Sequence, residues 1–332
     1  MQIPQFWAEA RLVGDVKGKR RVVRRFGWSD VDGASAQQHA DERAAVALRA
    51  LQAGQEVPRR EAKLAYGERG LPIREQVLVR RGDLVVTRNA YGARCLNEPD
   101  VLFADIDRQP RLPRWLEFAF RDLFFHSAWI GITSAATMFA VKSRLLGCAT
   151  LVAALLVPVF LLLVRDLLRG RLHDVRRSDA TALARIARVV AGLPDARAAV
   201  YETPNGFRVL LLHTTFDPAA EATQRLLRAL GTDPAYVQMC ALQRCFRARL
   251  SGKPWRLTGG PKGRLPGGVW PVAAERAEAR AAWLTRYEAA AKHHAACRFR
   301  HELGTGPVHA RCGAVQRLHD EACGARSTLP LA

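Results

Sequence analysis

Two apolar runs in the middle of the chain restrict its fold more than any other feature. Residues 123–141 read LFFHSAWIGITSAATMFAV, and residues 145–164 read LLGCATLVAALLVPVFLLLV, a run of 20 residues without a charge. At ~1.5 Å of rise per residue, ~20 helical residues span the ~30 Å hydrocarbon core of a bilayer. The pair therefore predicts a transmembrane helical hairpin over residues 123–164. A buried hairpin in a helical bundle is the alternative, but the second run lacks the polar stripe typical of such helices.

Basic residues at the ends of the runs predict how this hairpin is oriented. The turn between the runs holds Lys142 and Arg144, whereas the outer flanks hold nine arginines: Arg108, Arg111, Arg114, Arg121, Arg165, Arg169, Arg171, Arg176 and Arg177. Lysine and arginine accumulate on the cytoplasmic side of membrane proteins. We therefore expect an inner-membrane protein with both polar halves in the cytoplasm and with membrane lipid as a partner.

The overall composition adds a strong positive charge. Among 332 residues there are 51 Lys and Arg against 31 Asp and Glu, a net charge of +20, and the hydrophobic fraction of 49% excludes a wholly disordered chain. No acidic residue lies between Asp233 and Glu275. Such an excess predicts anionic partners, either nucleic acid or membrane phosphate. The seven scattered cysteines favour reduced thiols in the cytoplasm.

The polar halves each read as mixtures of strands and helices. In residues 1–107 we expect strands over 6–13, 20–26, 76–80, 84–87 and 101–106 and a helix over 34–53, capped by Ser29, Asp30 or Ser35. In residues 178–271 we expect a helix from Ser178, strands over 198–201 and 207–213 joined by an Asn-Gly turn, a helix over 218–230 and a long loop. Residues 272–332 predict a helical C-terminal region, with one helix over 272–303. The fold class is therefore α+β, with two cytoplasmic parts that pack together around the hairpin.

Asp105 and Asp107 are the best candidates for metal ligands. They end the apolar run VLFADID, and residues at i and i+2 of a strand project from the same face. Two carboxylates placed in this way suit Mg²⁺ or Mn²⁺, which neutralises phosphate during nucleotide chemistry. The alternative is a strand that ends in a solvated Asp-X-Asp turn.

Candidate phosphate ligands follow in the second half. Arg208 leaves the Asn-Gly turn and His213 ends the same strand, while the segment CFRARLSGKPWR surrounds one tryptophan with basic side chains: Arg247, Arg249, Lys253, Trp255 and Arg256. Cations interleaved with an aromatic ring suit phosphates and a stacked base. A basic loop lying on lipid headgroups is the alternative.

The order of these motifs resembles the archaeo-eukaryotic primase-polymerase superfamily. Hydrophobic-Asp-X-Asp comes first, then Thr-Pro-Asn-Gly-Phe-Arg, then Asp-Pro-X-X-Tyr and an Arg-X-Arg-X-X-X-Lys-Pro segment. The resemblance implies that Asp105, Asp107 and Asp233 are catalytic and bind metal. Arg208 stands where that family has a histidine, His213 is displaced along the strand, and Asp233 is alternatively a helix N-cap. The opening Phe-Trp-Ala-Glu-Ala-Arg-Leu also resembles uncharacterised bacterial membrane proteins, which implies no function.

Histidines and cysteines near the C-terminus suggest a second metal hypothesis, which the spacing does not favour. One set is His309, Cys312, His319 and Cys323, and another is His293, Cys297 and His301, which would share one helical face at i, i+4 and i+8. Structural zinc sites use tighter paired spacing on a recognisable turn. Ordinary helical His and Cys residues are the simpler interpretation, so zinc is not expected.

Two functional hypotheses remain open at this stage. The first is a membrane-tethered, Mg- or Mn-dependent nucleotide- or nucleic-acid-processing module, nucleotidyltransferase-like if active and otherwise degenerate. The second is a non-catalytic membrane protein whose basic domain binds anionic lipid or protein partners.

Overall fold

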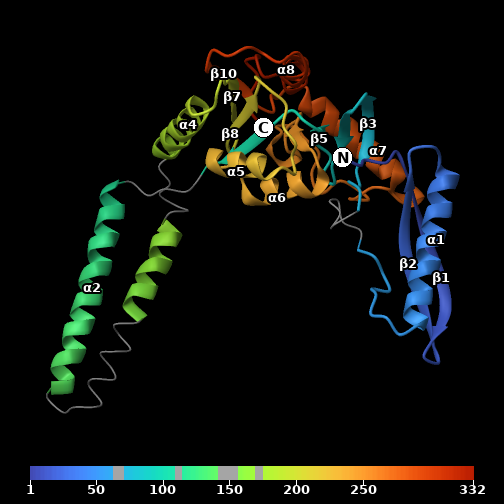
Figure 1. Cartoon of the computed structure of the whole chain (residues 1–332), viewed down its shortest axis with the longest axis horizontal. Coiled ribbons are helices and arrows are strands. Elements are labelled where there is room, and N and C mark those ends of the chain that lie inside the picture. The colour runs from blue at the N-terminus through green and yellow to red at the C-terminus, as the bar shows by residue number, and fades with distance from the viewer. Residues whose placement is uncertain (63–70, 109–113, 141–155, 169–174) are drawn as a thin grey trace. The chain divides into compact units, whose positions relative to one another are not determined.

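The computed structural model describes residues 1–62, 71–108, 114–140, 156–168 and 175–332 (Figure 1). The chain forms two compact units. The first unit combines Met1–Asp107 with Ile186–Ala332, and the second is Arg108–Arg185.

The N-terminal part of the first unit is a long hairpin covered by one helix. Strands β1 (Phe6–Val16) and β2 (Lys19–Ser29) pair antiparallel, and helix α1 (Gly33–Gln52) packs against both strands (Figure 1). The predicted hairpin and helix are thus confirmed, although the N-cap is Asp32, whose carboxylate accepts a hydrogen bond from the Ser35 N–H at 2.7 Å. The buried face of α1 is a row of small side chains: Ala36, Ala40, Ala44 and Ala47. Such residues let the helix lie close to the strands.

Two four-stranded antiparallel sheets form the rest of this unit. One has the order β3-β4-β5-β9 and contains β3 (Gln76–Arg81), β4 (Leu84–Arg88), β5 (Arg94–Glu98) and β9 (Phe246–Arg249). The other has the order β10-β7-β8-β6 and contains β6 (Phe103–Asp107), β7 (Ala198–Thr203), β8 (Gly206–Leu211) and β10 (Arg298–Leu303). Each sheet therefore joins strands from both halves of the sequence.

The Tyr236 hydroxyl links the two sheets. It accepts a hydrogen bond from the Arg247 N–H of β9 at 3.0 Å and lies 3.0 Å from the carbonyl oxygen of Phe103 in β6. The helices of this region are α5 (Glu221–Leu230), α6 (Pro234–Gln243), α7 (Ala277–Ala291) and α8 (Ala310–Cys323), with short 3-10 turns η1 (Pro254–Arg256) and η2 (Ala274–Arg276). Every residue of β8 is buried, so this strand lies in the core.

The predicted helix over residues 272–303 is wrong in its second half. Helix α7 ends at Ala291, and Arg298–Leu303 pairs instead as β10 with β7. Between them, the Ala295 N–H donates to the Pro330 carbonyl, and the Ala295 carbonyl accepts from the Ala332 N–H. These long-range backbone hydrogen bonds outweigh the helical preference of the alanine-rich sequence.

The predicted transmembrane hairpin is also wrong. The second unit contains helix α2 (Arg114–Ala140), which spans 27 residues, and a helical segment over residues 156–168. Helix α4 (Val175–Ala191) contains the boundary between the two units. In the ranges that the structure describes, no helix is long and apolar enough to cross a membrane. Helix α2 holds Arg121, Asp122 and His126 in its first half. Residues 141–155, which contain much of the second apolar run, lie outside the described residues. The predicted inner-membrane location and orientation depended on this hairpin and are therefore wrong as well.

Candidate functional site

An ion pair between Asp105 and Arg208 lies at the centre of the predicted site. Asp105 in β6 stands directly opposite Arg208 in β8 because the strands are in antiparallel register. Arg208 Nε donates to Asp105 Oδ1 at 2.8 Å, and Nη2 donates to Oδ2 at 3.3 Å. The Arg208 side chain is 1% exposed and the Asp105 side chain 34% exposed. Burial acts to raise the pKa of Asp105, but Arg208 holds it below its ordinary value.

The other two predicted catalytic carboxylates have local partners. Asp107, the exposed last residue of β6, accepts a hydrogen bond on Oδ1 from the Asn205 side-chain amide at 3.0 Å. Asp233 is the N-cap of α6 and accepts from the Ala235 N–H at 3.1 Å, while its own N–H donates to the Asp105 carbonyl at 3.1 Å. The backbone of Asp233 is thus hydrogen-bonded to that of Asp105, whereas its carboxylate caps helix α6.

Four of the predicted phosphate ligands gather beside Asp105 and Asp107. They come from the end of β9 and from the following turn η1: Arg249, Lys253, Trp255 and Arg256. The Trp255 side chain is 66% exposed, and Lys253 Nζ lies 5.5 Å from the centre of its ring. Tyr91 packs edge-on against Trp255 at 5.4 Å between ring centres; burial raises the pKa of the Tyr91 hydroxyl, and the nearby Arg249 side chain acts to lower it. We call Tyr91 and these four residues the basic-aromatic cluster.

The cations of this cluster repel one another, which disfavours their protonated forms. Burial lowers the pKa of Lys253, and Arg249 and Arg256 lower it further, while Asp107 and Asp105 act weakly in the opposite direction. Burial and Arg249 likewise lower the pKa of Arg256. Among the ion pairs of the described residues, none joins a carboxylate to any of these three cations within 4.0 Å. A bound anion would relieve this repulsion.

Two of the predicted phosphate ligands lie elsewhere. Arg247 is buried and donates to Glu75 Oε2 at 2.7 Å inside the β3-β4-β5-β9 sheet. His213 follows the opposite end of β8 from Asp107, and its ring packs against Phe216 at 5.8 Å between centres. Arg247 therefore stabilises the sheet, and His213 is not part of the basic-aromatic cluster.

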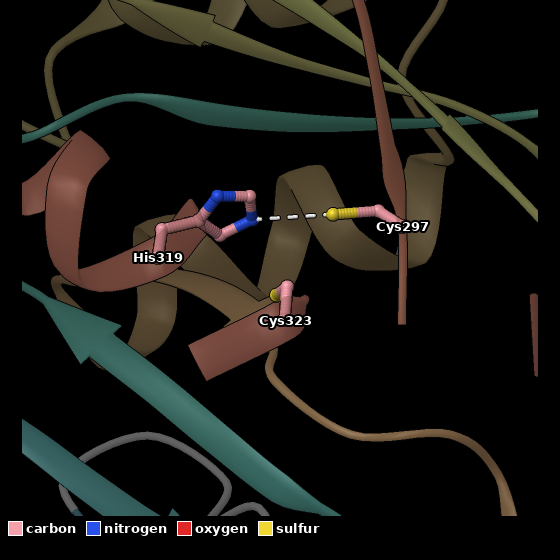
Figure 2. Close-up of side chains that lie close together, drawn as sticks. All are labelled: Cys297, His319 and Cys323. Carbon is pink, nitrogen blue, oxygen red and sulfur yellow. Dashed lines mark hydrogen bonds between the residues drawn. The ribbon is translucent and has the colours of Figure 1, made fainter. Parts of the chain in front are cut away.

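Two cysteines and a histidine lie next to the Arg208 guanidinium. Cys297 precedes β10, while His319 and Cys323 occupy successive turns of α8, and their side chains converge (Figure 2). His319 Nε2 lies 3.7 Å from Cys297 Sγ and 3.2 Å from Arg208 Nη1. A hydrogen bond from Cys323, together with His319, lowers the pKa of the Cys297 thiol, whereas burial raises the pKa of Cys323. Cys297 is therefore the cysteine that loses its proton more readily.

This Cys297, His319 and Cys323 group is the one set of three potential metal ligands that the described part of the chain brings within 4.8 Å of one another. Asp105, Asp107 and Asp233 do not form such a set, and both carboxylate oxygens of Asp105 are engaged by Arg208. Their role as ligands of Mg²⁺ or Mn²⁺ stays a prediction.

Sequence reasoning missed Tyr91 and the combination of Cys297 with His319 and Cys323. Tyr91 lies in a tight turn before β5, where it carries no motif. The spacing His319-X3-Cys323 was a partial signal, since residues i and i+4 share a helical face. Cys297 was assigned to a helix, so nothing in the sequence placed it opposite α8.

Comparisons with known protein families, with curated proteins and with solved structures found no match to this chain.

Proposed function

We propose that this protein binds single-stranded nucleic acid, or the nucleotides of which it is made, at the basic-aromatic cluster. The observation that supports this most is the exposed Trp255 ring, flanked by Lys253 and by Arg249 and Arg256, which form no salt bridge within 4.0 Å among the described residues. A base stacks on an exposed aromatic ring, and neighbouring cations bind its phosphates.

The local framework suits such a ligand. The Tyr91 ring packs edge-on against Trp255, and the Tyr91 hydroxyl interacts electrostatically with the Arg249 side chain. The Arg249 carbonyl in turn accepts a hydrogen bond from Arg208 Nη1 at 3.0 Å. These contacts hold the ring and one cation in place before the ligand arrives, which reduces the entropy lost on binding. The resemblance to primase-polymerases favours the same ligand class, and catalysis is not part of the proposal.

Binding of a fluorescein-labelled oligothymidylate, measured by anisotropy over a series of salt concentrations, tests this proposal. The double variant Lys253→Ala/Arg256→Ala removes two phosphate contacts, so the slope of log K against log salt should fall by about 1.4. Trp255→Ala should weaken binding by about 5- to 160-fold, since stacking contributes about 1–3 kcal/mol per base. Arg225→Ala/Arg228→Ala removes the same charge from the exposed side of α5 and is the matched control.

Two outcomes would refute the proposal. If the control weakens binding as much as the site variant, the oligonucleotide responds only to net charge. If phosphatidylserine vesicles bind through the same residues and the oligonucleotide does not, the cluster recognises lipid headgroups instead.

A further inference from the structure

We propose that Cys297, His319 and Cys323 bind one zinc ion. The three side chains are buried and their ligand atoms all lie within 4.8 Å of one another; Figure 2 shows the His319 ring and the Cys297 sulfur facing each other, with Cys323 nearby. Thiolate and imidazole donors together are typical of zinc, whereas Mg²⁺ and Ca²⁺ take oxygen ligands. This site is separate from the basic-aromatic cluster and does not depend on its function.

The distance between Cys297 Sγ and His319 Nε2 matches one edge of a tetrahedral zinc site. With Zn–S of ~2.3 Å and Zn–N of ~2.0–2.1 Å, the sulfur-to-nitrogen edge of a tetrahedron is roughly 3.5 Å and the sulfur-to-sulfur edge roughly 3.8 Å. Cys297 Sγ and His319 Nε2 are 3.7 Å apart. A shift of a few tenths of an ångström therefore brings this pair to coordination distance, and Cys323 Sγ lies within 4.8 Å of both atoms. Three protein ligands leave one tetrahedral position for a small donor such as water.

The surroundings orient His319 as a ligand. Its Nδ1 lies 3.1 Å from Asp320 Oδ1, while Nε2 lies 3.7 Å from Cys297 Sγ and 3.2 Å from Arg208 Nη1. A carboxylate behind the histidine is the usual outer partner of a zinc-bound imidazole. The ring is also held between Phe103 and Tyr201, with ring centres at 5.3 and 4.8 Å. These contacts fix the ring before any metal binds.

The charges of this buried region balance when zinc is bound. Two thiolates neutralise Zn²⁺, and the Asp105 carboxylate neutralises Arg208, whose Nη1 lies 3.2 Å from His319 Nε2. Zinc therefore adds no uncompensated charge to the interior.

The ion would tie two separate chain segments together. Cys297 lies at the entry to β10, and α8 follows only after that strand. Arg208 Nη1 contacts both His319 Nε2 and the Arg249 carbonyl, and the Cys323 thiol lies 3.5 Å from the same carbonyl. Zinc would thus stabilise the packing of α8 against the start of β10 and the end of β9.

Metal analysis of the full chain tests the proposal. Protein purified without chelators should contain about one zinc ion per chain by inductively coupled plasma mass spectrometry. Cys323→Ala should lose most of this zinc. Cys312→Ala is the matched control, because Cys312 is also a buried cysteine of α8, yet its sulfur donates to the Thr214 carbonyl outside the cluster.

Cobalt binding keeps the test decisive if Cys323→Ala fails to fold. Titration of the metal-free wild type with Co²⁺ should give the thiolate charge-transfer and tetrahedral d–d bands of a site with two sulfur ligands, and zinc should displace them. Wild type that holds no zinc and binds no Co²⁺ would overturn the proposal. A Cys297–Cys323 disulfide throughout freshly purified protein, found by mass spectrometry under non-reducing conditions, would also overturn it.

Discussion

Replacing Asp105 with asparagine removes the negative charge that faces the buried Arg208 guanidinium. Arg208 is 1% exposed, so water cannot replace the carboxylate. Two of its other contacts are a backbone carbonyl and His319 Nε2, neither of which carries a negative charge. The variant therefore removes the carboxylate that neutralises this buried cation.

The expected cost follows from this burial. Removing one partner of a buried ion pair costs about 3–5 kcal/mol. We expect the lower end, about 3 kcal/mol, because the Asp105 side chain is one-third exposed and asparagine still accepts a hydrogen bond. At an unfolding entropy of about 2.1 cal/mol/K per residue, a loss of about 3 kcal/mol lowers the melting temperature of a chain of this size by about 4 °C. It lowers the urea midpoint by about 1 M at an m-value of about 3 kcal/mol/M.

Urea denaturation of four proteins measures the effect. Asp107→Asn, two residues along the same strand, is the matched control and should change stability by less than about 0.5 kcal/mol, since its carboxylate is exposed. Arg208→Met and the double variant Asp105→Asn/Arg208→Met complete a double-mutant cycle. The double variant should be less destabilised than the sum of the single variants by at least about 1 kcal/mol, because it removes both charges together.

Strict additivity in this cycle, or a cost below about 1 kcal/mol for Asp105→Asn, would refute the reasoning. If the reasoning holds, Asp105→Asn is a poor probe of ligand binding. Lost binding in that variant would then report a weakened fold rather than a missing ligand contact.

Two further predictions concern stability. Burial raises the pKa of Glu98 to about 7 despite its contact with Arg311, so the folded state holds a proton on this carboxyl more tightly than the unfolded state does. The resulting stabilisation is fully present below the unfolded-state pKa of 4.5 and is lost as pH rises through 7. Unfolding free energy should therefore fall by up to about 3 kcal/mol between pH 5 and pH 8 in urea titrations, and Glu98→Gln should remove most of that fall; an equal fall in both proteins would contradict the assignment. Gly27→Ala should cost at least about 2 kcal/mol in thermal denaturation, because a Cβ there would lie 2.1 Å from the Ala40 backbone nitrogen. Gly33→Ala, where a Cβ meets nothing within 4 Å, is its control, and equal melting temperatures would contradict the close packing of α1 on β2.

Local sequence signals were sufficient for much of the secondary structure. The strands around Lys17 and Gly18 follow from alternation and a tight turn, and both of these residues adopt positive φ. The Asn205-Gly206 step likewise joins β7 and β8. Each feature depends on neighbours within a few residues, so the sequence alone determines it. Strand β5 and helix α6 were missed because Arg94–Glu98 and Pro234–Gln243 carry weak periodic patterns.

Apolarity over residues 123–164 was a misleading signal. Hydropathy reports how unfavourable water is for a segment, and it does not distinguish a bilayer from another apolar environment. The membrane prediction therefore depended on length and composition alone, and the described helices do not meet those requirements.

The sequence by itself identified many of the chemically important residues of both sites, and tertiary structure decided which of them meet. Asp105, Arg208, Arg249, Lys253, Trp255 and Arg256 were all candidates before their arrangement was known. Pairing of β6 with β8 made Asp105 the counter-ion of Arg208, and pairing of β5 with β9 left Arg247 facing Glu75. Cys297 meets His319 and Cys323 only because residues after α7 form a strand rather than a longer helix. Contacts between residues far apart in sequence depend on which backbone groups pair across the fold, and no local pattern encodes that choice.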